Sequence, residues 1–407
     1  MPLLSEEELR ERIVRLAAIE RGSASAGERR AAEEIVAEMA GLGWRARIEE
    51  EPAHGTYWWP LGLITGIAAL AGASRRRGKT ALAGLSAAAA AVDDLRIGPR
   101  VARRALPRRT TANVVAEIGP PDAPRTVLFV AHHDAAHTGL VFHPELPRAL
   151  GRRLPWLLER TNTTPPTMWP AVAGPLLVGL GALLGVSGAR RLGTVLSAGF
   201  ALAMADIGSR PVVPGANDNL TGVAVLLSLA RALRQEAPAG LRVILLSTGS
   251  EESLMEGMAA YARRHFPSLA PDRTSVICVD TVGSPRLTLL EGEGMLGIRD
   301  YPPELTGLVQ GCAERLEIPL LRGLRFRNAT DGVVALRAGY PSAMLGSVDR
   351  FRLPTDYHWP TDTPDNVDYG SVADAARLCL AVARQLSEEG PRHAHPFQAQ
   401  PTRASRA

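Results

Sequence analysis

Several residue types that often guide an interpretation are scarce in this sequence. There are only three cysteines, Cys278, Cys312 and Cys379, and none stands in a CxxC or paired spacing. This argues against a disulfide framework and predicts buried, reduced thiols that carry no chemistry. Lys79 is the only lysine, so nearly all of the basic charge is arginine. No nucleic-acid motif accompanies the net charge of +4, and we expect no nucleic-acid partner.

We also expect no cleavable secretion signal. The amino terminus, MPLLSEEELRERIVRL, is acidic and amphipathic, whereas a signal peptide is basic and then apolar. Ser5 with Glu8, and Ser25 with Glu28, each fit a capping box, in which serine and glutamate bond reciprocally to backbone amides. The sequence therefore predicts two helices within residues 5–42, the second ending at the Gly-Leu-Gly step of residues 41–43.

Short apolar runs alternate with helical patterns over most of the remaining chain. The runs predict strands at 113–118, 126–131, 241–247, 275–280 and 342–346. Apolar residues recur at helical spacing in 219–233 and 371–386. This alternation predicts an α/β fold with a mixed, mainly parallel sheet sandwiched by helices. The tail at 389–407 has no periodicity, and we expect it to be disordered.

Two segments, 57–94 and 166–208, contain few charged residues. Each consists of an apolar run, a basic loop and a second apolar run, and each opens on a Trp-Pro step. We expect two helical hairpins inserted in the bilayer of a bacterial cell, and the stretch 168–188 is long enough to span it. A buried interface between soluble subunits is the alternative. Arginines occur both in the hairpin loops and in their flanks, so they do not decide which side the remaining chain faces; the flanking ones could form a belt on anionic headgroups.

Histidines and acids stand directly after several predicted strands. His132 follows TVLFVA, Glu251 and Glu252 follow LRVILLSTGS, and Asp280 ends SVICVD. The carboxyl ends of strands in open α/β sheets share one edge, so we expect these residues to converge there with the polar loops at 215–219 and 356–366. A cluster rich in carboxylates needs cations or protons to compensate its charge. Two imidazoles and three carboxylates would suit a pair of zinc ions and would leave one acid unligated.

At this point the sequence resembles the co-catalytic zinc exopeptidases, which include bacterial leucyl aminopeptidases and glutamate carboxypeptidase, with glutaminyl cyclases as fold relatives. The resemblance covers residues 5–56, 110–139 and 210–388. Its motifs are His132-His133-Asp134, Asn217-Asp218-Asn219, Glu251-Glu252, Asp280, and His358 followed by Pro360-Thr361-Asp362-Thr363. The resemblance implies a peptidase domain over residues 1–388, interrupted by the two hairpins, that hydrolyses peptide bonds.

The resemblance also implies a role for each motif. One zinc would take His132, Asp218 and Asp280, and a second would take Asp218, Glu252 and His358. Glu251 would act as the general base, and Asp134 would orient a ligand. Tyr357 is a candidate partner for the oxyanion. His133, His137 and His143 match no ligand position and are interpreted as surface or pocket-wall residues.

Two departures from the family pattern bear on function. The chain between Asp134 and Asp218 is much longer than the family's short loop and contains the second hairpin, which could form a lid or hold the pocket at the membrane. The sequence ATDG at 329–332 replaces a Ser-Asp-His step of many relatives, which puts substrate contacts from that loop in doubt.

We expect a membrane-associated aminopeptidase with two zinc ions per chain. A carboxypeptidase, with Arg325 or Arg327 binding the substrate carboxylate, and a cyclase are alternatives on the same fold. A catalytically silent membrane scaffold or receptor is an alternative of another class. Side-chain specificity and oligomeric state do not follow from the sequence.

Overall fold

A computed structural model describes residues 2–154, 156, 160–234 and 238–388, and the tail expected to be disordered lies outside them. A seven-stranded sheet in the order β1-β2-β4-β3-β5-β10-β6 forms the centre of the fold. The three central pairings, β4 with β3, β3 with β5 and β5 with β10, are parallel, and the outer pairings are antiparallel. The predicted mixed sheet flanked by helices is confirmed.

The elements of this unit have the following bounds. The strands are β1 Arg45–Ala53, β2 Arg109–Ile118, β3 Arg125–His132, β4 Leu241–Thr248, β5 Thr274–Val279, β6 Arg286–Leu289 and β10 Ser342–Val348, with a small second sheet of β7 Gly292–Glu293, β8 Arg299–Asp300 and β9 Arg325–Phe326. The helices are α1 Glu6–Ala17, α2 Ala26–Gly41, α9 Thr221–Ala232, α10 Glu256–His265, α11 Pro303–Arg315, α12 Asp331–Arg337 and α13 Tyr369–Glu388. All five strands expected from the sequence occur, whereas β1 was not expected because its residues, RARIEEEPA, are mostly charged.

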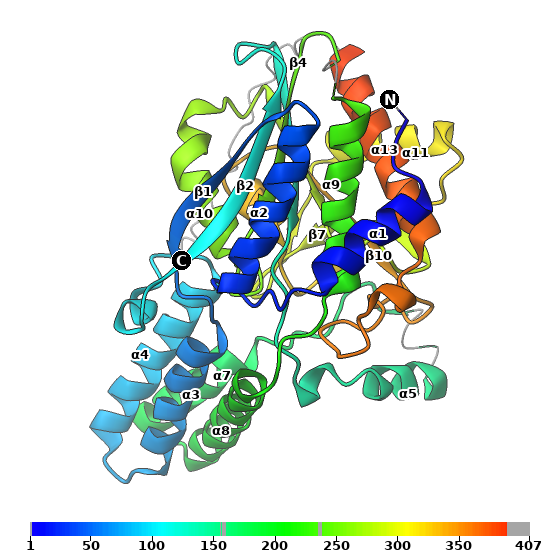
Figure 1. The fold of residues 1–407 in the computed structure, drawn as a ribbon. Helices are drawn as coiled ribbons and strands as arrows, with labels where there is room; N and C mark the ends of the chain where they lie inside the picture. Colours follow the sequence, from blue (N-terminus) through cyan, green and yellow to red (C-terminus); the bar gives the residue numbers. More distant parts are fainter. Residues whose placement is uncertain (1, 155, 157–159, 235–237, 389–407) are drawn as a thin grey trace, which may run out of the picture.

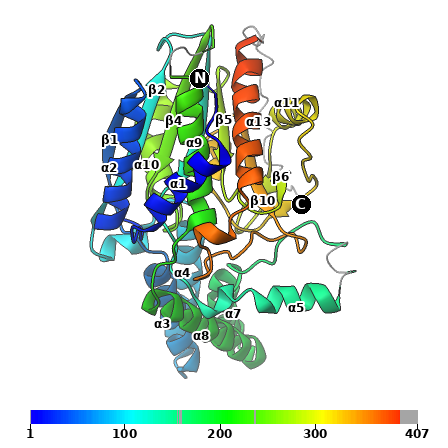
Figure 2. The ribbon, with the colours of Figure 1, turned by 45° about the vertical axis from the view of Figure 1, so that its right-hand side comes forward.

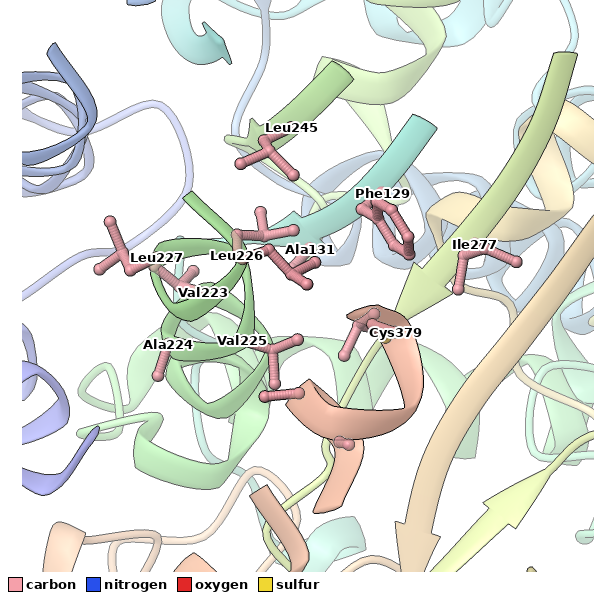
Figure 3. Close-up of a cluster of buried hydrophobic side chains, with 14 of the residues drawn as sticks. Phe129, Ala131, Val223, Ala224, Val225, Leu226, Leu227, Leu245, Ile277 and Cys379 are labelled. Atoms are coloured by element: carbon pink, nitrogen blue, oxygen red, sulfur yellow. The ribbon is translucent and has the colours of Figure 1, made fainter. Parts of the chain in front are cut away.

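Alternating side chains of the strands fill two separate cores. Phe129 of β3 faces a core formed with α1, α2, α9, α11 and α13, and its neighbours Leu128 and Val130 face a second core formed with α10 and α12. Figure 3 shows Phe129 close to Ile277 of the sheet and to Cys379 of α13. All three cysteines are buried and free, as the sequence predicts.

The two amino-terminal helices begin at the serines identified from the sequence, but only the first has a complete capping box. Ser5 accepts from the amide of Glu8, and the Glu8 carboxylate accepts from the amide of Ser5. Ser25 caps α2 in the same way, yet the carboxylate of Glu28 does not return to it. Glu28 is buried and bonds to other parts of the chain, as described below.

The low-charge segments form a bundle of four helices at one end of the sheet-bearing unit (Figure 1). The first pair is α3 Trp58–Ala73 and α4 Arg77–Leu95, and the second is α7 Pro170–Leu184 and α8 Ser187–Ser209. The expected continuous span over 168–188 is wrong, because the chain turns at Gly185, which has a φ of +73° that favours glycine. Among the described helices, α8 alone is long and apolar enough to cross a membrane.

The helices of the bundle approach one another closely at glycines. A Cβ atom on Gly84 of α4 would lie 2.5 Å from the backbone nitrogen of Gly179 of α7, and one on Gly193 of α8 would lie 2.6 Å from the carbonyl oxygen of Gly174. Large apolar side chains instead project outward. Those that are exposed on the bundle are Trp59, Leu63, Ile67, Leu70, Leu82, Leu176, Leu180, Leu183, Leu184, Leu192, Val195 and Leu202. The bundle is therefore packed through small residues and coated with large apolar ones.

Candidate metal centre

Four of the candidate residues lie at or just after the carboxyl ends of neighbouring strands, at one edge of the sheet. His132 is the last residue of β3, Glu251 and Glu252 lie in the loop after β4, and Asp280 follows β5 directly. Because β4, β3 and β5 are parallel, their carboxyl ends meet at this edge. Two further residues reach the same point from outside the sheet.

Asp218 comes from the turn before α9, and His358 comes from the loop after β10. One carboxylate oxygen of Asp218 lies 3.2 Å from Nε2 of His132, and the other lies 3.2 Å from Nε2 of His358. Nε2 of His358 is also 3.1 Å from a carboxylate oxygen of Glu252. A carboxylate oxygen of Asp280 lies 3.8 Å from Nε2 of His132. Asp218 thus stands between two half-sites, each with one histidine and one further acid.

The charges of this cluster are not balanced by the protein alone. Burial raises the pKa of Glu251 well above its ordinary value, raises that of Glu252, and raises that of Asp280 to about 6. Burial also opposes ionisation of Asp218, but hydrogen bonds from the two histidines hold the pKa of its carboxyl well below the usual range. The buried carboxylates compete for too few positive partners, which is the condition that a bound cation relieves.

The residues present fit a metal. His132, Asp218 and Glu252 offer ligand atoms that all lie within 4.8 Å of one another. Two buried atoms beside them, Oε1 of Glu252 and Nδ1 of His358, have no hydrogen-bond partner among the described residues. Imidazole and carboxylate are the donors that zinc takes in open, catalytic sites.

Comparisons with known proteins bear on the family and on the fold. Residues 199–383 match the model of peptidase family M28. This match covers less than half of the chain, and because of this resemblance we refer to the sheet-bearing unit, which contains most of the match, as the M28 domain. No curated protein matches the chain in sequence.

Solved structures show the same fold at low identity. A glutaminyl cyclase of Tannerella forsythia is 14% identical, with a TM-score of 0.57, and the match covers 94% of this chain and 99% of that one. An aminopeptidase from Aneurinibacillus sp. strain AM-1 is 15% identical, with a TM-score of 0.54 and coverage of 97% and 96%. A Zn-dependent exopeptidase from Parabacteroides distasonis is 12% identical, with a TM-score of 0.55 and coverage of 95% and 99%.

Asp134 joins two parts of the M28 site. Its carboxylate accepts hydrogen bonds from the backbone amides of Glu251, at 3.0 Å, and Glu252, at 3.1 Å. It also accepts one from the hydroxyl of Ser23 at 2.6 Å and lies 3.5 Å from Nδ1 of His132. The Asp134 carboxylate therefore lies beside a candidate ligand and holds the backbone that carries the two glutamates.

The loop after β4 needs this support because its backbone is strained. Ser250, Leu254 and Met255 have φ angles of +53°, +69° and +55°, which L residues rarely adopt. Glu28 of α2 accepts hydrogen bonds from both the amide and the hydroxyl of Ser250, each at 2.9 Å. Sequence reasoning assigned Glu28 to a helix cap, and only the fold shows that it supports the M28 loop from a helix far away in the sequence.

Asp362 supports Asp218 in a similar way. Its carboxylate accepts from the backbone amides of Asn217, at 2.6 Å, and Asp218, at 3.1 Å. The aspartate of the PTDT sequence thus positions the turn that carries the central carboxylate. The motif itself was the available signal for this role, since its aspartate stands four residues after His358.

Of the three histidines interpreted as surface or pocket-wall residues, His133 is placed differently. His133 is fully buried, with Nδ1 2.9 Å from the Ser247 hydroxyl, so it belongs neither to the surface nor to the pocket wall. Burial lowers the pKa of His133 to about 4. His143 is exposed, and His137 is half-buried against Trp58. In the ATDG sequence, Ala329 and Thr330 line the cavity of the M28 site, whereas Asp331 is buried and bonds to Thr248.

Proposed function

We propose that this chain is a membrane-associated, zinc-dependent exopeptidase that removes residues from the amino terminus of peptides. The match of residues 199–383 to peptidase family M28 supports hydrolysis of a peptide bond as the reaction. The observation that carries the choice of terminus is the lining of the cavity, which contains neither arginine nor lysine among the described residues. A substrate carboxylate would therefore find no cationic side chain there to bind it.

Two half-sites would hold the zinc ions. His132, Asp218 and Asp280 would form one, and Asp218, Glu252 and His358 would form the other. Bound zinc would lower the pKa of a water molecule and polarise the scissile carbonyl. No described ligand position is substituted by a residue that cannot bind zinc, which speaks against a silent scaffold.

Glu251 is the proposed general base. It lines the cavity, and its carboxylate lies 4.0 Å from Nε2 of His132, farther than the carboxylate oxygens of Asp218 are from the two histidines. Burial raises the pKa of this carboxyl, so it would hold a proton taken from water more readily than an exposed glutamate would. It would then deliver that proton to the leaving amine.

Tyr357 is the proposed partner for the developing oxyanion. It lines the cavity, and its ring stacks on that of His358 at a centroid distance of 3.8 Å. Burial raises the pKa of its phenol well above the ordinary value, so the hydroxyl remains a hydrogen-bond donor at neutral pH.

The arginines considered for a carboxypeptidase are engaged elsewhere. Arg325 bonds to Asp300 at 2.9 Å, and the guanidinium of Arg327 lies over the ring of Trp169 at 5.2 Å. Neither lines the cavity, although the residues beside them, Phe326 and Asn328, do. This arrangement favours aminopeptidase over carboxypeptidase action.

A cyclase is the second candidate, because several of the solved structures with this fold are named glutaminyl cyclases. Zinc content separates the two proposals, since the five ligands proposed here would hold two ions per chain. Product analysis separates them as well, because a cyclase releases ammonia and no amino acid from a peptide that begins with glutamine.

Membrane association is supported by the surface of the bundle. Only 28% of the most apolar stretch of α8 is buried, whereas the core helix of a soluble protein is mostly buried. Large apolar side chains cover the outside of the bundle while glycines form the helix contacts, which is typical of helices packed in lipid. We propose that the bundle lies in a cell membrane with the M28 domain on one side of it.

The test uses the detergent-purified, zinc-loaded protein and peptides with free or acetylated amino termini. We expect amino acids to be released from free termini only, and two zinc ions per chain by elemental analysis. Glu251→Gln should lower kcat at least 100-fold with zinc still bound, while the exposed control Glu304→Gln should match the wild type. Release from acetylated peptides, or full activity of Glu251→Gln, would contradict the proposal.

A further inference from the structure

The chain between β3 and the second hairpin forms a surface segment beside the metal centre. It contains the short helix η2 Leu140–Phe142 and the helix α5 Glu145–Arg153. Both views show α5 extending sideways from the junction between the sheet-bearing unit and the bundle, and in Figure 1 it lies across the direction of α3 and α4 (Figures 1 and 2). We refer to residues 140–153 as the junction segment.

The junction segment contacts both the bundle and the metal centre. The amide of Leu140 donates to the carboxylate of Asp206 on α8 at 2.6 Å. The ring of Phe142 packs edge-on against that of His358 at a centroid distance of 4.6 Å. Arg148 lies 3.6 Å from Asp356 in the loop that carries His358. The segment is thus fixed to the bundle at one point and to a proposed zinc ligand at another.

Its outer surface combines apolar and basic side chains. Leu140 is 62% exposed, Val141 53% and Leu150 49%, although their neighbour Phe142 is turned inward. The segment contains three arginines, at 148, 152 and 153, and one acid, Glu145. Arg286 and Arg350 line the same hollow as Arg148 and Arg152, so four arginines face two acids there, Glu145 and Asp349. Exposed leucines beside arginines are typical of surfaces that rest on anionic headgroups.

The position of this surface indicates what covers it. The exposed apolar side chains of the bundle end where the bundle meets the sheet-bearing unit. The first residue of the junction segment, Leu140, lies there in space, hydrogen-bonded to Asp206 near the carboxyl end of α8. If the bundle lies in lipid, α5 stands at the level of the headgroups and lies across the inserted helices. A bilayer would cover both the exposed leucines and the arginines of the junction segment. The same bilayer would also cover the adjoining apolar surface of the bundle.

We propose that the junction segment rests on the anionic headgroups of a bilayer and holds the mouth of the metal centre at the membrane surface. The substrates would then be peptides whose amino termini lie close to the bilayer, such as those of membrane-anchored chains. The choice of substrate rests on the proposed peptidase function, and the contact with lipid rests on the proposed membrane association.

The contact with lipid is tested by attaching one fluorophore to a single introduced cysteine. The three native cysteines are buried, so an environment-sensitive fluorophore can be attached to Leu150→Cys in the full chain. In nanodiscs with anionic lipid, we expect quenching of this label by lipids that carry a shallow nitroxide. A label at Leu70→Cys in the bundle should be quenched as well, and one at exposed Ala37→Cys on α2 should not.

The functional test compares a soluble peptide with the same peptide anchored by a carboxyl-terminal acyl chain. Arg152→Gln and Arg153→Gln, both exposed positions, should each lower kcat/KM for the anchored peptide about fivefold in anionic nanodiscs. Cleavage of the soluble peptide should be unchanged. In nanodiscs of zwitterionic lipid the difference between wild type and variants should disappear.

The outcomes distinguish the two proposals. Quenching at position 70 without quenching at 150 would overturn the headgroup contact and leave membrane insertion intact. Equal loss on soluble and anchored peptides would also overturn it, because the arginines would then act on the enzyme alone. If no peptide is cleaved by any form, the peptidase function fails, and quenching at position 150 still decides whether the junction segment contacts lipid.

Discussion

A single carboxylate, Asp134, fixes the relative position of the proposed base and two proposed ligands. It accepts from the amides of Glu251 and Glu252 and lies beside the ring of His132. An asparagine has one acceptor oxygen where the carboxylate has two, and its amide nitrogen would face a donor. Replacing Asp134 by asparagine would therefore keep the volume of the side chain but lose hydrogen bonds that hold the site in place.

We predict that Asp134→Asn lowers kcat and the affinity for zinc by about 10- to 100-fold each. The substrate KM should change much less, because Asp134 does not line the cavity. Steady-state kinetics at saturating zinc, together with a zinc titration, measure both effects. Asp122→Asn, in an exposed turn, is the control. Unchanged kinetics and zinc affinity in Asp134→Asn would show that Ser23 and the backbone suffice to hold the loop.

Residues at strand ends could be predicted to lie together, but their supports could not. His132, Asp218, Asp280 and His358 meet because parallel strands and the loops beside them share one edge. Glu28 had a sufficient local explanation as a helix cap, and its partner Ser250 is distant in the sequence. A local pattern does not reveal which long-range partner a buried carboxylate will choose.

At the scale of elements, the first hairpin is tied to the loop after β4 by a buried ion network. Arg103, in the short helix η1 Val101–Ala105, binds both carboxylate oxygens of Asp94 at the end of α4, at 2.6 and 3.1 Å. The same guanidinium donates to the carbonyl of Ser253 at 2.9 Å and lies 3.0 Å from Glu256. The expectation that Arg103 could belong to a belt on the headgroups is wrong, because its side chain is fully buried.

We predict that Arg103→Met destabilises the protein by about 3–5 kcal/mol, because Asp94 and Glu256 would remain buried without their partner. Thermal unfolding in detergent measures this loss, and kcat should fall with it as the loop after β4 loosens. The neighbouring Arg104→Met is the control, since Arg104 is exposed. Adding Asp94→Leu to Arg103→Met should restore part of the stability. If Arg103→Met and Arg104→Met have the same unfolding temperature, the ion network contributes nothing to stability.

The sequence predicted the hairpins as pairs of apolar runs, but it placed one turn wrongly. The basic residues Arg190 and Arg191 were taken for the loop, whereas they lie in the first turns of α8 and the chain reverses at 184–187. Glycines occur throughout this segment, both at helix contacts and at the turn. Composition does not distinguish a glycine that packs from a glycine that reverses the chain.

At the scale of the whole molecule, the bundle is joined to the sheet-bearing unit at two places. The bundle is attached through the Arg103 network on one side and through the junction segment on the other. Both attachments reach loops that carry proposed catalytic residues. We therefore expect a change in helix packing within the bundle to alter the geometry of the metal centre.

This coupling is tested at the contact between α4 and α7. A side chain at Gly84 would collide with the backbone of Gly179, so Gly84→Leu should separate the helices and cost at least about 1–3 kcal/mol. The control is Gly199→Leu on α8, where a Cβ atom meets nothing within 4 Å and an added leucine would face lipid.

We expect wild type and both variants to resist extraction from membranes by alkaline carbonate, because the apolar surface persists. Thermal stability and peptidase activity should fall only in Gly84→Leu. Release of the wild type by carbonate would show that the bundle is a soluble interface, and full activity of Gly84→Leu would show that the M28 domain works independently of it.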